Sequence, residues 1–375
     1  KTQIFSAPSV KSGPRAPAAI ARRSARTPRT LLTKMTDKFY SQIVSDPETC
    51  HAPWASARPP PGPSATAGAL AREYTGGDQE DSPMNVPIPG QAAPASPPIP
   101  HLTLATGAPI PVLGFGTYKI APTDAYDAVS RALDAGYRHI DTAQMYGNEA
   151  EVGAALEASG IAREELFVTT KVDNSNHEPE RAARSIAHSL DRLGTDYVDL
   201  LLVHWPLPTL YGGNVALPWP ALEESYAAGQ ARAIGLSNYE RIHVEAVRAV
   251  ARIAPHVLQV EAHPFFPNGA LRRYAHELGM VFEAWSPLAR GRVTTDPTLL
   301  EVAEELGVGP AQVALRWALD RGHVVFPKTL NPTRMASNID VFSFALTCDQ
   351  RKRIDALDSG ESGRTGSHPA TMDRL

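Results

Sequence analysis

The chain has 375 residues, of which 43% are hydrophobic and 20% are charged, so it is long enough to bury a large core. Its net charge of -4 gives no electrostatic reason to expect nucleic acid or an anionic membrane as a partner, and no apolar run approaches the roughly 20 residues that span a bilayer. The two cysteines, Cys50 and Cys348, form no CxxC motif or Cys/His cluster, which argues against a zinc site and suits a reducing cytosol.

Residues 1–99 are rich in Pro, Ala, Ser, Gly and Arg and show no sustained apolar period, so we predict a disordered extension. The sequence does not begin with Met, and one interpretation is that translation starts at Met84. The alternative is a transit peptide, because the first 36 residues are Arg-rich and hold no acid before Asp37. We expect a cytoplasmic protein, with organelle targeting by the extension as the open alternative.

From Ile110 onward, short apolar or β-branched runs alternate with amphipathic helical runs. In the first helical run, Thr123 or Asp124 can cap the helix, and Ala128 and Leu133 share one face. Glycines that follow the helical runs are expected to end them in the left-handed conformation. The predicted strands cover residues 112–118, 137–142, 166–172, 198–205, 231–238, 257–263, 280–287 and 323–328.

Eight strand–helix units with strands this apolar predict an α/β fold, a (β/α)8 TIM barrel over residues 100–375. The preceding stretch LTLATGAPIP, residues 102–111, has the turn chemistry of a short β-hairpin. We expect this hairpin to plug the bottom of the barrel.

Four ionisable side chains fall at the ends of consecutive strands. In HIDTAQMYGNEAEVG, Asp141 ends the second strand and Tyr146 follows on its loop. Lys171 ends the third strand, and His204 ends the fourth. One polar residue at a strand end is usually a cap or a hydrogen-bonded filler, but the C-terminal strand ends of a barrel meet at one rim. We therefore predict that these four side chains converge there as a catalytic site.

Together these groups have the chemistry to protonate an oxyanion. A phenol with a pKa near 10 needs help to donate its proton at neutral pH. An ammonium about 4 Å away favours the phenolate by roughly 4 kcal/mol at an effective dielectric of about 20, while burial opposes this shift. Asp141 would keep Lys171 protonated, so we expect a lowered Tyr146 pKa, with His204 bonded to a carbonyl oxygen beside the hydroxyl.

The motifs GFGTYK, YRHIDTAQMYGNEAEVG, VTTKV, LLVHWP, IGLSNY, LQVEAHP, WSPLARG and FPKTLNPTRMASN stand in this order. They resemble the signature blocks of the aldo-keto reductases over roughly residues 100–375, and bacterial members similar to 2,5-diketo-D-gluconate reductase in particular. The resemblance implies a catalytic tetrad of Asp141, Tyr146, Lys171 and His204. It also implies that Tyr146 gives the proton and NADPH the hydride during carbonyl reduction.

The run GFG lacks the third glycine of a dinucleotide-binding fingerprint, so no Rossmann site is predicted. Instead, three strand ends carry hydroxyl or amide groups that can pair with a carboxamide, and the resemblance implies that they hold nicotinamide. It further implies that an indole covers the nicotinamide ring and that the loop SPLARG contacts the pyrophosphate. The residues predicted for this part of the cofactor are Ser237, Asn238, Gln259, Trp285, Ser286, Leu288 and Arg290.

A phosphate site is predicted after the eighth strand. Lys328, Thr329, Arg334 and Asn338 bring two cations, a hydroxyl and the start of a helix to a region where barrels often bind phosphate. No carboxylate for a free ribose hydroxyl is evident, which favours NADPH over NADH. Ser337 stands where many family members have a glutamate that contacts adenine, so weaker adenine recognition is expected.

The predicted walls of the substrate pocket are Tyr118, His204, Trp205 and the loop 206–219. Two residues after the catalytic lysine, family members often have a tryptophan, whereas this chain has Asp173. A negative group at the pocket mouth would repel carboxylated substrates.

The leading hypothesis is a monomeric NADPH-dependent reductase of aldehydes or ketones. One alternative is a cofactor-binding regulatory subunit with little catalysis. Another is an aldolase barrel in which Lys171 forms a Schiff base. No metal is predicted, since His177 and His188 are expected on the surface without a metal partner.

Overall fold

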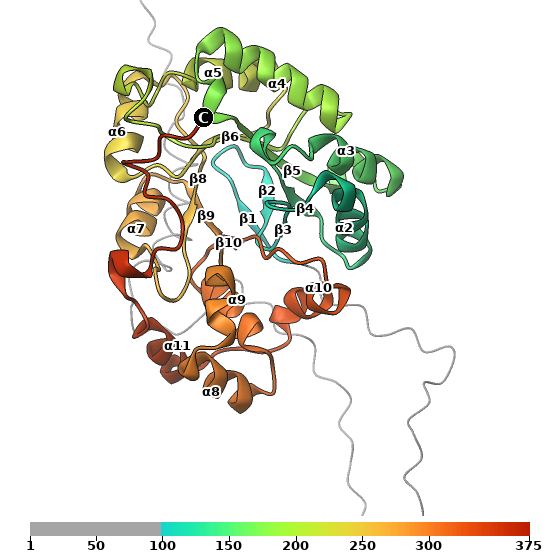
Figure 1. Cartoon of the computed structure of the whole chain (residues 1–375), viewed down its shortest axis with the longest axis vertical. Coiled ribbons are helices and arrows are strands. Elements are labelled where there is room, and N and C mark those ends of the chain that lie inside the picture. The colour runs from blue at the N-terminus through green and yellow to red at the C-terminus, as the bar shows by residue number, and fades with distance from the viewer. Residues whose placement is uncertain (1–98) are drawn as a thin grey trace, which may run out of the picture. The chain divides into compact units, whose positions relative to one another are not determined.

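Eight parallel strands form one sheet that curls into a barrel, and helices surround it (Figure 1). The computed structural model describes residues 99–375. Sheet order follows chain order from β3 to β10, and a parallel bridge from Leu113 to Val325 joins the two edges. The predicted (β/α)8 barrel is confirmed, whereas the predicted extension, including Met84, lies outside the described residues.

All eight predicted strands are present, each shorter than its apolar run because the ends of the runs enter the rim loops. The strands are β3 (Phe115–Gly116), β4 (His139–Asp141), β5 (Phe167–Val172), β6 (Leu200–Val203), β7 (Ile234–Ser237), β8 (Val257–Glu261), β9 (Val281–Trp285) and β10 (Val324–Val325).

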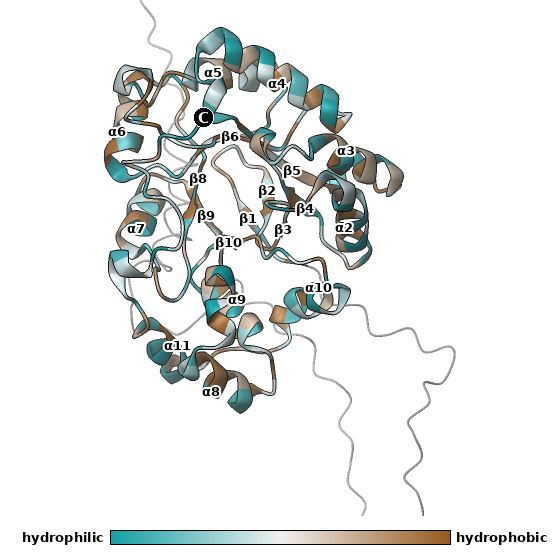
Figure 2. Ribbon diagram, viewed as in Figure 1, coloured by the Kyte–Doolittle hydropathy of each residue, from teal (hydrophilic) through white to brown (hydrophobic). Residues whose placement is uncertain are grey.

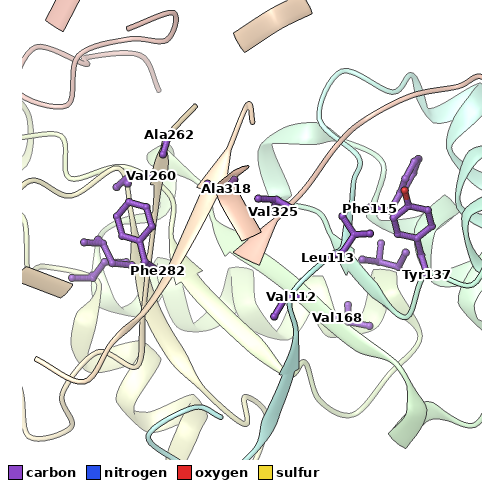
Figure 3. Close-up of a cluster of buried hydrophobic side chains, with 14 of the residues drawn as sticks. Val112, Leu113, Phe115, Tyr137, Val168, Val260, Ala262, Phe282, Ala318 and Val325 are labelled. Atoms are coloured by element: carbon purple, nitrogen blue, oxygen red, sulfur yellow. The ribbon is translucent and has the colours of Figure 1, made fainter. Parts of the chain in front are cut away.

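Alternating side chains of the strands face the barrel interior and the helices. Phe167 packs with Leu200 and Val257 in one buried cluster, inside the barrel. Val168 and Phe282 belong to a second, larger cluster between the strands and the helices (Figure 3). The strands read as nearly continuous apolar runs because both of their faces are buried.

The helices cover the barrel with their apolar faces inward, and Figure 2 shows hydrophilic residues along the outer sides of α4 and α5. Helix α2 begins at Pro122 after Ala121, and no side chain caps it, so the expected cap by Thr123 or Asp124 is wrong. Proline fixes the first helical φ and moves the start ahead of both residues. The helices are α2 (Pro122–Asp134), α3 (Glu149–Ala158), α4 (Pro179–Leu193), α5 (Trp219–Ala227), α6 (Arg241–Val250), α7 (Gly269–Glu277), α8 (Pro297–Leu306), α9 (Pro310–Asp320), α10 (Pro332–Ile339) and α11 (Cys348–Asp355).

The predicted hairpin is present as β1 (His101–Thr103) and β2 (Pro109–Pro111), paired antiparallel. Its buried residues Leu104 and Ile110 join the interior cluster that contains Phe167, at the N-terminal end of β5. The hairpin therefore closes the end of the barrel opposite the C-terminal strand ends. Among residues 99–375, no helix combines the length and the apolar character that crossing a bilayer requires.

Candidate active site

The inward phase of each strand carries polar side chains at its C-terminal end. Asp141, Lys171 and His204 share the phase of the interior apolar residues on β4, β5 and β6 or just beyond them. Gln259 pairs in register with Ser237 on one side and Glu283 on the other. The apolar layer below and this polar layer above divide the barrel interior.

Asp141 and Lys171 form a buried ion pair at the centre of the site. The Lys171 Nζ atom lies 2.7 Å and 2.8 Å from the two carboxylate oxygens, and the lysine is 1% exposed. It also donates to the Thr142 carbonyl oxygen at 2.9 Å and to the Tyr146 hydroxyl at 3.3 Å. The structure thus brings together the phenol, the ammonium and the carboxylate that the sequence predicted.

Local structure explains how Tyr146 reaches the rim. The loop after β4 makes one 3-10 turn (Gln144–Tyr146), which Gly147 ends with a φ of 68°. Fully buried Asn148 donates to the carbonyl oxygens of Thr117 and Ile120 at 3.1 Å each, which fixes this loop against the one after β3. The phenol is therefore held from both sides of its turn.

Burial decides the protonation of the neutral groups. It raises the pKa of Tyr146 well above its usual value, and the negative charge of Asp141 raises it further. The expected lowering of the pKa is wrong because burial penalises the phenolate, and the nearby Asp141 carboxylate, which pairs with Lys171, adds to that penalty. Burial, with Lys171 second, lowers the pKa of His204 well below its usual value. The His204 and Tyr146 rings meet edge to face with centroids 5.7 Å apart.

Glu283 was missed by the sequence reasoning and lies beside these groups. The Gln259 amide nitrogen donates to Asp141 Oδ2 and to Glu283 Oε2, at 2.9 Å each, and so bridges the two acids. Burial, followed by the charge of Asp141, raises the pKa of Glu283 to about 8. An acid in the inward phase of an otherwise apolar strand is the signal that could have identified it.

Two of the residues predicted to hold nicotinamide, Asn238 and Trp285, are joined by a hydrogen bond. Asn238 donates to the His204 carbonyl oxygen at 2.8 Å and to Ser237 Oγ at 3.1 Å, and it accepts the Trp285 indole N–H at 2.8 Å. Trp285 is half-buried. The hydrogen bond from its Nε1 atom to Asn238 fixes the position of the indole.

The loop after β9 has an unusual backbone. Ser286, Ala289 and Arg290 have positive φ values of 54°, 46° and 54°, which L-residues rarely adopt. Ser286 and Leu288 are half-buried, and Arg290 is exposed. Strained backbone of this kind concentrates at ligand-binding loops.

The predicted phosphate residues gather at the start of α10. Lys328 and Arg334 are exposed, and within residues 99–375 neither forms an ion pair with an acid. Thr329 is 8% exposed and precedes the helix, whereas Asn338 is 3% exposed and lies in the last turn of α10 rather than at its start, so that part of the prediction is wrong. Ser337 donates to the Arg334 carbonyl oxygen at 3.2 Å within the helix.

The predicted substrate walls lie at two depths. Tyr118 is 53% exposed, and its ring centroid lies 5.1 Å from that of Tyr146. Trp205 is buried in a cluster with Leu207 and Met372. Met372, near the end of the chain, was not predicted for this wall, because no local pattern tells where a terminal segment packs.

In the loop after β5, His177 is not on the surface as expected, and Asp173 has a structural role. His177 is fully buried rather than on the surface and stacks on Tyr211 with ring centroids 5.0 Å apart, whereas His188 is exposed as expected. Asp173 accepts the backbone N–H and the hydroxyl of Ser175 at 2.9 Å and 2.7 Å, so it caps the 3-10 turn that follows.

Comparisons with known proteins show what the chain as a whole is similar to. The Aldo/keto reductase family model matches residues 112–359. The chain is 42% identical over 252 residues to 2,5-diketo-D-gluconic acid reductase B of a Corynebacterium species, covering 67% of this chain and 89% of that protein. It is 40% identical over 274 residues to morphine 6-dehydrogenase of Pseudomonas putida, covering 70% and 91%. The crystal structure of a Gox0644 mutant in complex with NADPH is similar with a TM-score of 0.69 and 36% identity, covering 72% and 98%.

Proposed function

Because the chain belongs to the aldo/keto reductase family, we propose that it reduces aldehydes or ketones to alcohols with NADPH, with Tyr146 as the proton donor. The observation that carries the proposal is the line of contacts from the Tyr146 hydroxyl through Lys171 to Asp141 at the rim of the barrel. Of the relatives above, one is named a reductase and another a dehydrogenase, so we propose that the reduction is reversible.

The side chains present fit a nicotinamide dinucleotide. Trp285, which is half-buried and fixed through its hydrogen bond to Asn238, offers an indole for stacking on a flat ring. Lys328 and Arg334 offer two exposed cations beside a helix start, where a ribose phosphate would bind. When bound, NADPH would supply the hydride.

The protein residues then have distinct roles. Tyr146, which burial keeps protonated, donates a hydrogen bond and finally a proton to the carbonyl oxygen. Lys171 stabilises the developing phenolate, and Asp141 holds the ammonium in place. His204, which burial keeps neutral, is the second hydrogen-bond donor to the same oxygen. Tyr118 and Trp205 form walls for the carbon skeleton of the substrate.

The Schiff-base alternative fits this geometry poorly. A lysine nucleophile must present its nitrogen to the substrate, but the Lys171 Nζ atom is engaged in hydrogen bonds to Asp141, Thr142 and Tyr146. A subunit that binds NADPH with little turnover would keep the same cofactor residues. Measured turnover separates that alternative from an enzyme.

The proposal is tested by following NADPH absorbance with the purified chain over a panel of aldehydes, ketones and sugar-derived dicarbonyls. We expect turnover with at least one carbonyl compound and a shift of tryptophan fluorescence when NADPH is added. Binding without turnover on the whole panel would favour the regulatory subunit. A borohydride-trapped substrate adduct on Lys171 would favour the aldolase.

A further inference from the structure

Glu261 is a buried acid that the proposed chemistry does not use. It ends β8, points inward in the phase of Gln259, and is 1% exposed. Its carboxylate accepts hydrogen bonds from the Thr365 N–H at 2.6 Å, the Thr365 hydroxyl at 2.5 Å and the Gly366 N–H at 2.9 Å. The His263 Nε2 atom lies 3.1 Å from the same carboxylate.

These hydrogen bonds require both carboxylate oxygens of Glu261 to act as acceptors. Although burial alone would raise the pKa of Glu261, the hydrogen bonds from His263, Thr365 and Gly366 lower it below its usual value. The group is therefore an ionised carboxylate at neutral pH. An amide in its place would direct an N–H at one of the donors of Thr365 or Gly366.

The three donors from the chain end belong to residues 363–374, here named the C-terminal segment, which runs past α7 and α6 (Figure 1). Gly366 lies so close to the ring of Trp285 that a Cβ would come within 2.4 Å of Cη2. Met372 packs with Trp205, and the Arg374 carbonyl oxygen accepts from Asn174 at 2.7 Å. The C-terminal segment thus connects the two tryptophans of the proposed site.

The packing of the C-terminal segment is interrupted beside Arg364 and Pro369. A pocket of about 270 Å³ lies between it and the starts of α6 and α7. Arg364 and Pro369 line one side of this pocket, and Glu240, Leu271 and Tyr274 line the other. Where apolar contact is interrupted in this way, the charge-assisted hydrogen bonds to Glu261 carry more of the attachment.

We propose that Glu261 is a positioning residue that fixes the C-terminal segment as a wall of the substrate pocket and so determines which carbonyl compounds bind. The inference rests on the proposed function for the identity of the pocket. Glu261 acts through Gly366, which touches Trp285, and through the path of the segment to Met372, which touches Trp205. It does not contact the tetrad.

The first measurement needs no substrate. Trypsin cleavage after Arg364, whose side chain is 11% exposed, is compared between the wild-type chain and Glu261→Gln. Loss of charge-assisted hydrogen bonds should raise the open population and the cleavage rate by about tenfold or more. Asp373→Asn removes an exposed charge from the same segment and should leave the cleavage rate unchanged.

The second measurement is the KM of two aldehydes. For an aromatic aldehyde that reaches Trp205, the KM should rise by about tenfold in Glu261→Gln, as expected when a contact wall is lost. For a short aliphatic aldehyde, the KM and kcat should stay unchanged. Gly366→Ala should reproduce this pattern with Glu261 intact, because its Cβ would displace the segment from Trp285.

Faster cleavage without the selective rise in KM would overturn the proposal, and so would wild-type behaviour of both variants. If Glu261→Gln does not fold, Glu261→Asp, which keeps the charge but shortens the side chain that reaches Thr365 and Gly366, takes its place in both measurements. A wild-type chain that neither binds NADPH nor reduces any aldehyde would refute the proposed function. In that case the cleavage comparison would still test whether Glu261 holds the segment, and an unchanged rate would reject it.

Discussion

Burial gives the ionisable residues of the site two different electrostatic states. Lys171 and Asp141 form a salt bridge, with 2.7 Å between the lysine Nζ atom and the carboxylate. Tyr146, His204 and Glu283 are kept neutral because burial penalises their charged forms. A carbonyl oxygen would therefore meet two neutral hydrogen-bond donors, with one ammonium behind them.

Tyr146→Phe is expected to lower kcat by about 10²- to 10⁴-fold, because the proton donor is lost. NADPH affinity should not change, since the hydroxyl contacts Lys171 rather than the predicted cofactor residues. Steady-state kinetics and fluorescence titration with NADPH measure the two effects. Tyr118→Phe is the matched control, because it removes an exposed hydroxyl of the adjacent ring and should keep kcat. A fully active Tyr146→Phe enzyme would contradict the assignment.

Glu283→Gln should change how stability depends on pH. The folded-state pKa is raised to about 8 from a usual value near 4.5, so protonated Glu283 stabilises the fold at low pH. That stabilisation is fully present below about pH 4.5 and is lost as the pH rises to about 8. Glutamine keeps the acceptor for Gln259 and cannot ionise, so the variant should not show this loss.

The measurement is the Tm of both proteins between pH 5 and 9. The Tm of Glu283→Gln relative to wild type should increase up to about pH 8 and then level off. Parallel Tm curves over the whole range would show that Glu283 does not titrate in this interval.

At the level of elements, the pattern of apolar residues predicted the fold and the rim. A buried parallel strand must be apolar on both faces, so each apolar run indicates a strand. Because side chains alternate along a strand, the same runs indicate that Lys171 and Asp141 point into the barrel. Contacts between distant loops leave no such pattern. His177 is covered by Tyr211, which belongs to another loop 34 residues away, and sequence reasoning left it on the surface.

Lys328→Ala or Arg334→Ala should raise the KM for NADPH by about 10- to 100-fold, the expected cost of losing a charge-assisted hydrogen bond to phosphate. The KM for NADH should change little, because NADH lacks that phosphate. Lys352→Ala removes an exposed cation from α11 and serves as the control. Equal losses for both cofactors would reject the phosphate role of α10.

At the scale of the whole molecule, the barrel and its hairpin account for the described residues. The composition of residues 1–83 predicts no contribution to the core. A chain that starts at Met84 should therefore unfold at the same temperature as the full chain and keep its turnover. A substantially lower Tm, measured by calorimetry or circular dichroism, would contradict this prediction. A monomeric state and a cytoplasmic location remain predictions, and sedimentation checks the first.

The β1–β2 hairpin leaves the barrel open at one end only. Leu104 and Ile110 fill the lower opening, so a molecule that enters the polar layer has only the upper rim through which to leave. Two reactants that both bind through this rim must bind in a fixed order. The reactant that lies deeper binds first and dissociates last. If the outer reactant dissociates slowly, its release rather than the chemical step would then limit the turnover rate.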